Sequence, residues 1–155
     1  MDFKDIEGND VNLPEDKFFS WRPATYGYLV KDNALLCIKP AWDNKYALPG
    51  GAIELGEEPI QSLKREFLEE TGYRIEVEKQ QPTYFKTVLF AAPISKNFYQ
   101  SLIFFYEVKL DSHIQEDCIE LGKETEKISW KNISEINLED FTHFQRDFLK
   151  MMLNK

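Results

Sequence analysis

The chain has 155 residues, a length typical of one compact domain, and its 43% hydrophobic and 14% aromatic residues can supply a core, which excludes a wholly disordered protein. A formal net charge of -8 argues against broad, sequence-independent nucleic-acid binding, which requires basic residues to displace counterions from phosphates. The sequence contains no apolar run of about 18 residues, so we expect no membrane span.

The N-terminal segment and the cysteines bear on where the protein works. Residues 1–19 alternate charged residues with single apolar ones, which differs from the basic and then apolar order of a signal peptide. Cys37 and Cys118 form neither a metal-ligand spacing nor a disulfide framework, so we expect two free thiols. We therefore expect a cytoplasmic protein with a single domain over residues 1–155, of which residues 1–20 form a short extension.

Short apolar runs predict strands in the first third of the chain. The turn residues at 7–10 predict a small hairpin within the N-terminal extension, with a loose tail as the alternative. The apolar runs 24–30 and 34–39 are joined by Lys31-Asp32-Asn33, a sequence typical of a hairpin turn. Residues 45–48 predict one further short strand.

A helix is predicted over residues 58–71. Acidic residues and Pro59 suit its first turn, and Gly72 is a typical helix stop. Runs rich in β-branched and aromatic residues then predict strands over residues 73–77, 83–91, 99–110 and 128–130. A second helix is predicted over residues 138–153, where phenylalanines recur at helical spacing. This order predicts an α/β fold with a mixed sheet covered on both faces.

The first predicted helix carries two adjacent stripes of side chains. Ile60, Leu63 and Phe67 form an apolar stripe suited to the core. The second stripe consists of carboxylates at positions i, i+3 and i+4, namely Glu66, Glu69 and Glu70. Like charges at these spacings repel one another, whereas Mg²⁺ prefers oxygen ligands and commonly bridges carboxylates to substrate phosphates. We interpret the acidic stripe as a metal site, with a solvated helix face as the alternative.

Residues around this helix are expected to support the metal site. Gly50 and Gly51 permit close approach of the main chain to an ion or a ligand, and a backbone carbonyl here can complete a metal shell. Arg65 lies beside the carboxylates, and Glu57 lies about two turns before it. A charge-assisted contact between Arg65 and Glu57 is expected to fix the orientation of the carboxylates.

Residues 51–73 resemble the Nudix signature, which is glycine-x5-glutamate-x7-arginine-glutamate-aliphatic-x-glutamate-glutamate-x-glycine-aliphatic. The seven fixed positions are Gly51, Glu57, Arg65, Glu66, Glu69, Glu70 and Gly72. At average amino-acid usage, a chance match has a probability on the order of 10⁻⁹ per starting point. The sequence departs from the pattern at Phe67 and Tyr73, where the family usually has aliphatic residues. This departure concerns packing and leaves the chemistry intact.

The resemblance implies a Nudix-type α/β/α sandwich and a pyrophosphohydrolase activity. Nudix hydrolases split a nucleoside diphosphate linked to another group, so the implied partner is a nucleotide-like small-molecule diphosphate. They use Mg²⁺ or Mn²⁺, and on the matching positions the implied ligands are Glu66, Glu69 and Glu70. The Gly50 carbonyl is a further candidate ligand. We expect a monomer or a homodimer.

Two glutamates are candidates for the general base, whose position varies within the family. Glu66 is the first. Glu124 is the second, because residues 124–130 resemble the family's acidic loop ahead of a short strand that ends in tryptophan. The resemblance implies that Glu124 reaches the metals as a ligand or as the base, although a solvated acidic loop explains it equally well. His113 and His143 have no partners at metal-ligand spacing, so we expect them to be surface or packing residues.

Residues outside the signature are expected to select the substrate. Nucleobases are commonly held by aromatic stacking with a few polar contacts. The aromatic candidates, for each of which packing in the core is the more common role, are Trp42, Tyr84, Phe85 and Tyr99. Arg22 and Lys39 are candidates for contacts with substrate phosphates.

Two other functions fit the fold. A non-catalytic Nudix module that binds a nucleotide as a regulatory signal usually loses signature glutamates, whereas this sequence keeps all of them. A diphosphate isomerase needs other acid and base groups, and Cys37 alone does not supply them. The sequence therefore favours a metal-dependent hydrolase.

Overall fold

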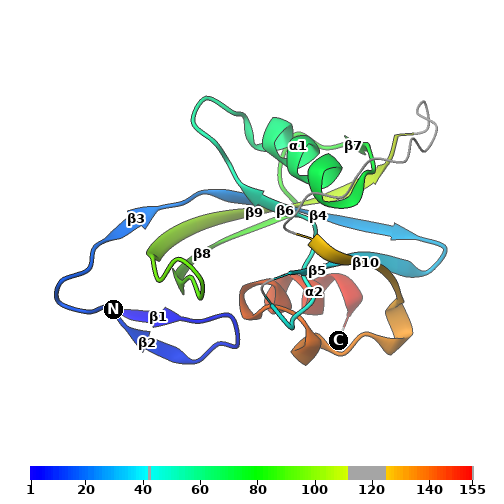
Figure 1. Ribbon diagram of the computed structural model, residues 1–155. Helices are drawn as coiled ribbons and strands as arrows, with labels where there is room; N and C mark the ends of the chain where they lie inside the picture. Colours follow the sequence, from blue (N-terminus) through cyan, green and yellow to red (C-terminus); the bar gives the residue numbers. More distant parts are fainter. Residues whose placement is uncertain (42, 112–124, 155) are drawn as a thin grey trace.

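The computed structural model describes residues 1–41, 43–111 and 125–154, and its strands form a mixed sheet that lies between helices (Figure 1). Helix α1 (Pro59–Thr71) lies on one side of the sheet, and helix α2 (Arg146–Leu153) lies on the other. This arrangement confirms the predicted α/β fold. No helix in the described ranges is long and apolar enough to cross a membrane.

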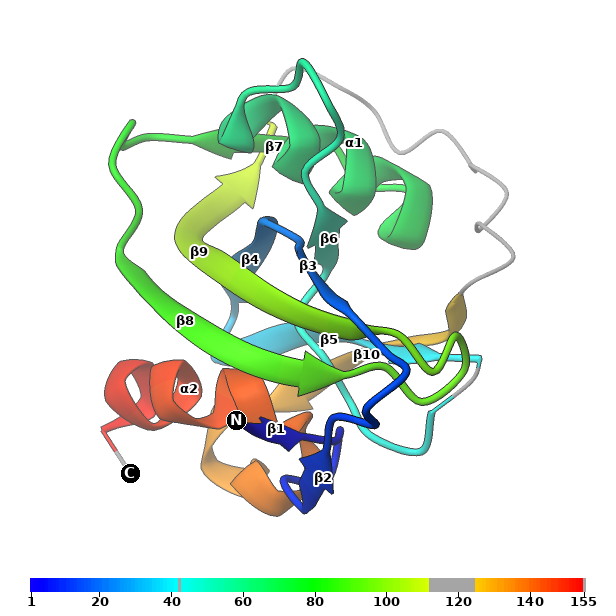
Figure 2. The same cartoon turned by 90° about the vertical axis from the view of Figure 1, so that its left-hand side faces the viewer.

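The sheet contains ten strands in the described part of the chain. Their bounds are β1 (Asp2–Lys4), β2 (Asp10–Asn12), β3 (Phe19–Trp21), β4 (Ala24–Lys31), β5 (Ala34–Pro40), β6 (Gly50–Ala52), β7 (Ile75–Val77), β8 (Tyr84–Ala91), β9 (Phe98–Leu110) and β10 (Thr125–Asn132). The main order is β10-β5-β4-β9-β8-β1-β2, while β3 and β7 pair with β9 and β6 pairs with β4. Figure 2 shows β8 and β9 as long, curved neighbours.

Parallel and antiparallel pairs are combined around the central strands. The β4–β9, β3–β9 and β1–β8 pairs are parallel, whereas the other pairs are antiparallel. The predicted β4–β5 hairpin is confirmed, and its turn residues Asp32 and Asn33 adopt φ values of 50° and 61°. The predicted N-terminal hairpin is also confirmed, because β1 pairs with β2 and docks on β8.

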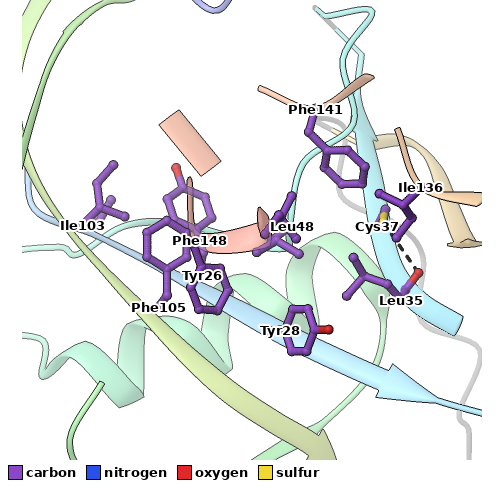
Figure 3. Close-up of a cluster of buried hydrophobic side chains, with 12 residues drawn as sticks. Tyr26, Tyr28, Leu35, Cys37, Leu48, Ile103, Phe105, Ile136, Phe141 and Phe148 are labelled. Carbon is purple, nitrogen blue, oxygen red and sulfur yellow. Dashed lines mark hydrogen bonds between the residues drawn. The ribbon is translucent and has the colours of Figure 1, made fainter. Parts of the chain in front are cut away.

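Side chains of the central strands alternate between two buried clusters. On the α1 side, Leu29 and Leu36 pack with Phe67 of α1. On the α2 side, Tyr28 and Phe148 belong to a second cluster, part of which Figure 3 shows with Tyr26, Leu48 and Phe105. Burial on both faces explains why β4 and β5 are continuous apolar runs. It also anchors α1 and places its acidic stripe at the edge of the helix–sheet interface.

The second helix is shorter than predicted. The helix predicted over residues 138–153 begins only at Arg146, after the 3₁₀ turns η1 (Ile133–Glu135), η2 (Leu138–Asp140) and η3 (His143–Gln145). The Asn137 side chain caps η2 by accepting a hydrogen bond from the Glu139 N–H. The extended backbone of Phe141 then interrupts the helical conformation. A 3₁₀ turn repeats every three residues, so it can bury phenylalanines at a spacing that also suits an α-helix.

The prediction of a continuous strand over residues 45–48 is wrong. Tyr46 and Ala47 form isolated bridges with Phe141 and Ile38, respectively. The segment instead runs into β6, a strand that the sequence analysis did not predict because Gly50 and Gly51 read as a strand stop. Strand β3, which pairs with β9, was also not predicted from the sequence. The predicted free thiol of Cys37 is confirmed, and this residue is fully buried.

A glycine on β4 makes room for Phe67, the residue that departs from the family pattern. A Cβ atom at Gly27 would lie 2.7 Å from Phe67 Cε2. We expect Gly27→Ala to lower the free energy of unfolding by about 1–3 kcal/mol through overpacking. Phe67→Leu should relieve the clash, so the double variant should lose less stability than the sum of the single variants. Urea denaturation of all four proteins measures this coupling, and strictly additive losses would contradict the proposed packing.

Candidate active site

Arg65 connects the acidic groups of the signature segment. Its Nε and Nη2 donate to the two carboxylate oxygens of Glu57, at 2.7 and 2.9 Å. Its Nη1 donates to Glu66 Oε1 at 2.8 Å and contacts Glu69 Oε2 at 3.4 Å. The predicted contact between Arg65 and Glu57 is thus confirmed. Such a two-pronged, charge-assisted pair fixes the guanidinium plane, and through it the position of the Glu66 carboxylate.

Hydrogen bonds also keep Glu57 ionised. The hydrogen bonds from Arg65 are the main reason why the pKa of Glu57 is lowered to about 2. A hydrogen bond from the Glu54 N–H also lowers the pKa. Reciprocally, the hydrogen bond to Glu57 raises the pKa of Arg65 above its ordinary value. Both groups therefore carry full charge at neutral pH. The pair forms a fixed support between the loop before α1 and the helix itself.

The two glycines of β6 bring the main chain against α1. Gly51 faces Glu66 so closely that an added Cβ would lie 2.7 Å from the Glu66 Cδ atom. The Gly50 N–H donates to Glu70 Oε2 at 2.7 Å. Gly50 has φ +143°, and a Cβ there would overlap the Thr25 carbonyl oxygen of β4. Residue 50 must therefore be glycine because of the backbone of β4, and residue 51 must be glycine because of the Glu66 carboxylate.

A cavity of about 340 Å³ opens beside these groups. Glu66 and Glu70 line it together with Gly50 and Gly51, whereas the described lining residues do not include Glu69. The Glu69 side chain is 56% exposed. The cavity continues past the glycines toward the β8–β9 turn and the C-terminal segment, whose lining residues are Phe90, Ala92, Pro93, Ile94, Ser95, Tyr99, Thr142, Phe144 and Gln145.

The donor set fits a hard divalent cation that is shared with a substrate. In the described ranges, no three His, Cys, Asp or Glu side chains already converge as a metal cluster. Two carboxylates do face one cavity, and they consist of the oxygen ligands that Mg²⁺ prefers. Since Mg²⁺ is usually bound by one or two carboxylates plus substrate phosphates, a preformed cage of three side chains is not required. Gly51, whose missing side chain leaves space for Glu66, is consistent with this use.

Comparison with known proteins decides the family. The NUDIX domain model matches residues 21–152. The chain belongs to the Nudix hydrolase family. A MutT-like protein from Streptomyces ambofaciens is 42% identical over 57 residues, which are 37% of this chain and 37% of that protein. The chain thus matches little more than a third of this curated relative.

Solved Nudix structures share the fold at low sequence identity. The NUDIX hydrolase from Nitrosomonas europaea has a TM-score of 0.66 and 22% identity, covering 85% of this chain and 89% of that chain. A mutator MutT protein from Bacillus halodurans has a TM-score of 0.61 and 21% identity, covering 86% and 83%. An ADP-ribose pyrophosphatase from Streptococcus suis has a TM-score of 0.59 and 14% identity, covering 86% and 90%.

Some of the predicted substrate-binding residues line the cavity of this Nudix domain, and others lie outside it. Arg22 and Tyr99 both line the cavity, and the Arg22 guanidinium lies 5.5 Å from the centre of the Tyr99 ring. Lys39, Tyr84 and Phe85 are not among the described lining residues. Tyr84 instead packs on Phe105 and Phe148 in the core.

Other predicted residues lie elsewhere or outside the described ranges. His143 packs beneath Gly8, where an added Cβ would lie 2.6 Å from its Nδ1 atom, which confirms the packing role. Four residues singled out in the sequence lie outside the described residues: Trp42, His113, Cys118 and Glu124.

The far wall of the cavity was not predicted from the sequence. Thr142, Phe144 and Gln145 come from the 3₁₀ region that was predicted as helix, and Ile94 comes from the β8–β9 turn. No local pattern marks these residues, because the order of strands in the sheet brings them to the signature segment. The aromatic excess of the chain was the only available signal.

Proposed function

We propose that this Nudix protein hydrolyses the diphosphate bond of a nucleoside diphosphate-linked compound in a reaction that requires Mg²⁺ or Mn²⁺. One observation carries the proposal: Arg65 ties Glu66 to Glu57 while Glu66 and Glu70 face one cavity beside two glycines. The name of one structural relative, an ADP-ribose pyrophosphatase, describes the same class of reaction.

The metal would be held by Glu66, Glu69 and Glu70, with the Gly50 carbonyl as a further ligand. When bound, the ion would neutralise phosphate charge and activate a water molecule for attack at phosphorus. Glu70 is held near Gly50 by the backbone N–H, and Glu66 is held by Arg65. Glu69 is exposed and contacts Arg65 at the longer distance of 3.4 Å, so it can reorient at little cost.

The remaining residues would position the reacting groups. Arg65 and Glu57 form a support that fixes Glu66 without occupying the cavity themselves, since neither is among the described lining residues. We assign the general base to Glu66, which lines the cavity, and keep Glu124 as the second candidate. A base must come within hydrogen-bond reach of the water whose proton it accepts. Arg22 lines the same cavity and would contact a substrate phosphate.

We also propose that the chain acts as a single domain over residues 1–155 in the cytoplasm, as a monomer or homodimer. Two clusters of buried side chains share the central strands β4, β5 and β9, which supports one folding unit. The N-terminal hairpin continues the sheet through β8, so residues 1–20 are joined to this unit.

A chromatographic screen tests the proposed activity. The purified chain is incubated with nucleoside triphosphates, nucleotide sugars, ADP-ribose and dinucleoside polyphosphates, in parallel with Mg²⁺, with Mn²⁺ and with EDTA. We expect cleavage products with at least one of these substrates in the metal-containing samples and none with EDTA. If the chain binds a nucleotide with a divalent ion but forms no new species in long incubations, the regulatory module should replace the enzyme as the preferred function.

A further inference from the structure

Two buried side chains that line the cavity each have one polar atom without a hydrogen-bond partner among the described residues. Gln145 is fully buried and Thr142 is 2% exposed, and both line the cavity. Gln145 Nε2 and Thr142 Oγ1 have no partner within the ranges that the structure describes. Burying an unsatisfied polar group is costly, and most buried polar atoms in proteins are hydrogen-bonded. A ligand that reaches Gln145 and Thr142 from the cavity would give these two atoms the hydrogen bonds that they lack.

The amide of Gln145 has a defined orientation. The Leu48 N–H donates to Gln145 Oε1 at 2.7 Å. Because a backbone N–H can only donate, the amide atom that faces it must be the oxygen, and an exchange of the two amide atoms is ruled out. The nitrogen is thus the free atom, and it offers N–H donors alone. Gln145 can satisfy an acceptor on a ligand, whereas a donor on the ligand would meet another donor.

Aromatic rings surround the same space. The Phe144 ring lies 5.7 Å from the Tyr26 ring and 5.5 Å from the Phe90 ring, measured between centroids. All three residues line the cavity together with Tyr99. Aromatic walls with a few polar groups are typical of sites for planar ligands, and a volume of about 340 Å³ lies within the range of such sites. Glu66 and Glu70 line the same cavity, so a nucleotide would place its base and its phosphates in one connected space.

We propose that Gln145 and Thr142 recognise a keto oxygen at C6 of a purine base or at C4 of a pyrimidine base. This inference rests on the proposed function, because it names the class of nucleotide that the same site prefers. A keto oxygen has two lone pairs and can accept hydrogen bonds from both Gln145 Nε2 and the Thr142 hydroxyl. Hypoxanthine and guanine present this oxygen at C6 and uracil presents it at C4, whereas adenine and cytosine present an amino donor at the same positions. Keto bases are therefore bound more tightly than amino bases.

Nucleoside monophosphates test this inference separately from catalysis, since they contain no diphosphate bond. Isothermal titration calorimetry compares IMP with AMP and UMP with CMP, two pairs that differ at the exocyclic keto or amino group. We expect the keto member of each pair to bind about tenfold more tightly, or more. Equal affinities within both pairs, or no binding of any of the four at millimolar concentration, would overturn the inference.

A matched variant sharpens the test. Gln145→Glu keeps an oxygen for the Leu48 N–H and places a second carboxylate oxygen where Nε2 was, so it should invert the IMP-to-AMP preference. Thr142→Val removes only the hydroxyl and should reduce the preference several-fold without inverting it. Thermal melting verifies that each variant folds. If Gln145→Glu does not fold, an unchanged preference in Thr142→Val rejects the proposal, as does an unchanged preference in a folded Gln145→Glu.

The outcomes separate the two proposals. If the wild-type chain prefers IMP to AMP but hydrolyses no diphosphate, the base-recognition site stands and the enzymatic function fails. If it hydrolyses nucleotides without discriminating between keto and amino bases, the enzymatic function stands and the role of Gln145 and Thr142 is rejected.

Discussion

Glu70→Gln is expected to lower Mg²⁺-dependent turnover by on the order of 10²-fold or more while the fold is kept. Glutamine retains an oxygen that can accept the hydrogen bond from the Gly50 N–H, now 2.7 Å from Glu70 Oε2, so the contact between β6 and α1 can persist. The amide nitrogen then takes the place of the second carboxylate oxygen. An N–H donor cannot ligate a cation, and the negative charge is lost as well.

The controls for this prediction come from the same chain. Glu69→Gln removes the exposed member of the acidic stripe and should also abolish most turnover, although its effect on stability should be within about 0.5 kcal/mol, as for other surface substitutions. Glu135→Gln makes the same change of charge at an exposed position of η1 and should leave turnover unchanged. Initial rates over a Mg²⁺ titration measure the effect. Wild-type turnover in both Glu69→Gln and Glu70→Gln would reject the metal site.

The signature segment could be predicted well because its signals are local. Pro59 and Gly72 mark the ends of α1 by backbone chemistry alone, and the structure places the ends within one residue of the prediction. The contact of Arg65 with Glu57 also follows from spacing along one loop and one helix. Such features depend on neighbours in the sequence, so a single sequence contains the information to predict them.

The opposite wall of the cavity depends on contacts between distant segments. Gln145 reaches the cavity because its side chain binds the Leu48 N–H, nearly a hundred residues earlier in the chain. Phe144 contacts Phe90, which lies on β8, a strand paired with β9 in the sheet. The phenylalanine spacing that predicted one long helix is spread over three different conformations, because Phe141 is extended, Phe144 lies in the 3₁₀ turn η3 and Phe148 lies in α2. Long-range packing of this kind leaves no periodic signal.

Alanine substitutions at the adjacent residues Gly50 and Gly51 are expected to have different effects. One should destabilise the fold, and the other should displace the Glu66 carboxylate. We expect Gly51→Ala to fold normally and to lose turnover by about 10–100-fold, a loss typical for groups that orient metal ligands. The added Cβ would lie within 2.9 Å of both Glu66 carboxylate oxygens, which belong to the end of a flexible side chain and can move away. Glu66 would then leave the position that Arg65 gives it.

Gly50→Ala should instead destabilise the whole protein. Its Cβ would overlap the Thr25 carbonyl oxygen, which is backbone and cannot rotate away, and the φ of +143° is strained for any residue with a side chain. A loss of about 3 kcal/mol corresponds to a melting temperature lower by about 6–12 °C. Thermal melting and initial rates distinguish the two effects. A Gly51→Ala variant with wild-type turnover would show that the position of Glu66 against β6 is irrelevant to the reaction, because nothing else about that variant is expected to change.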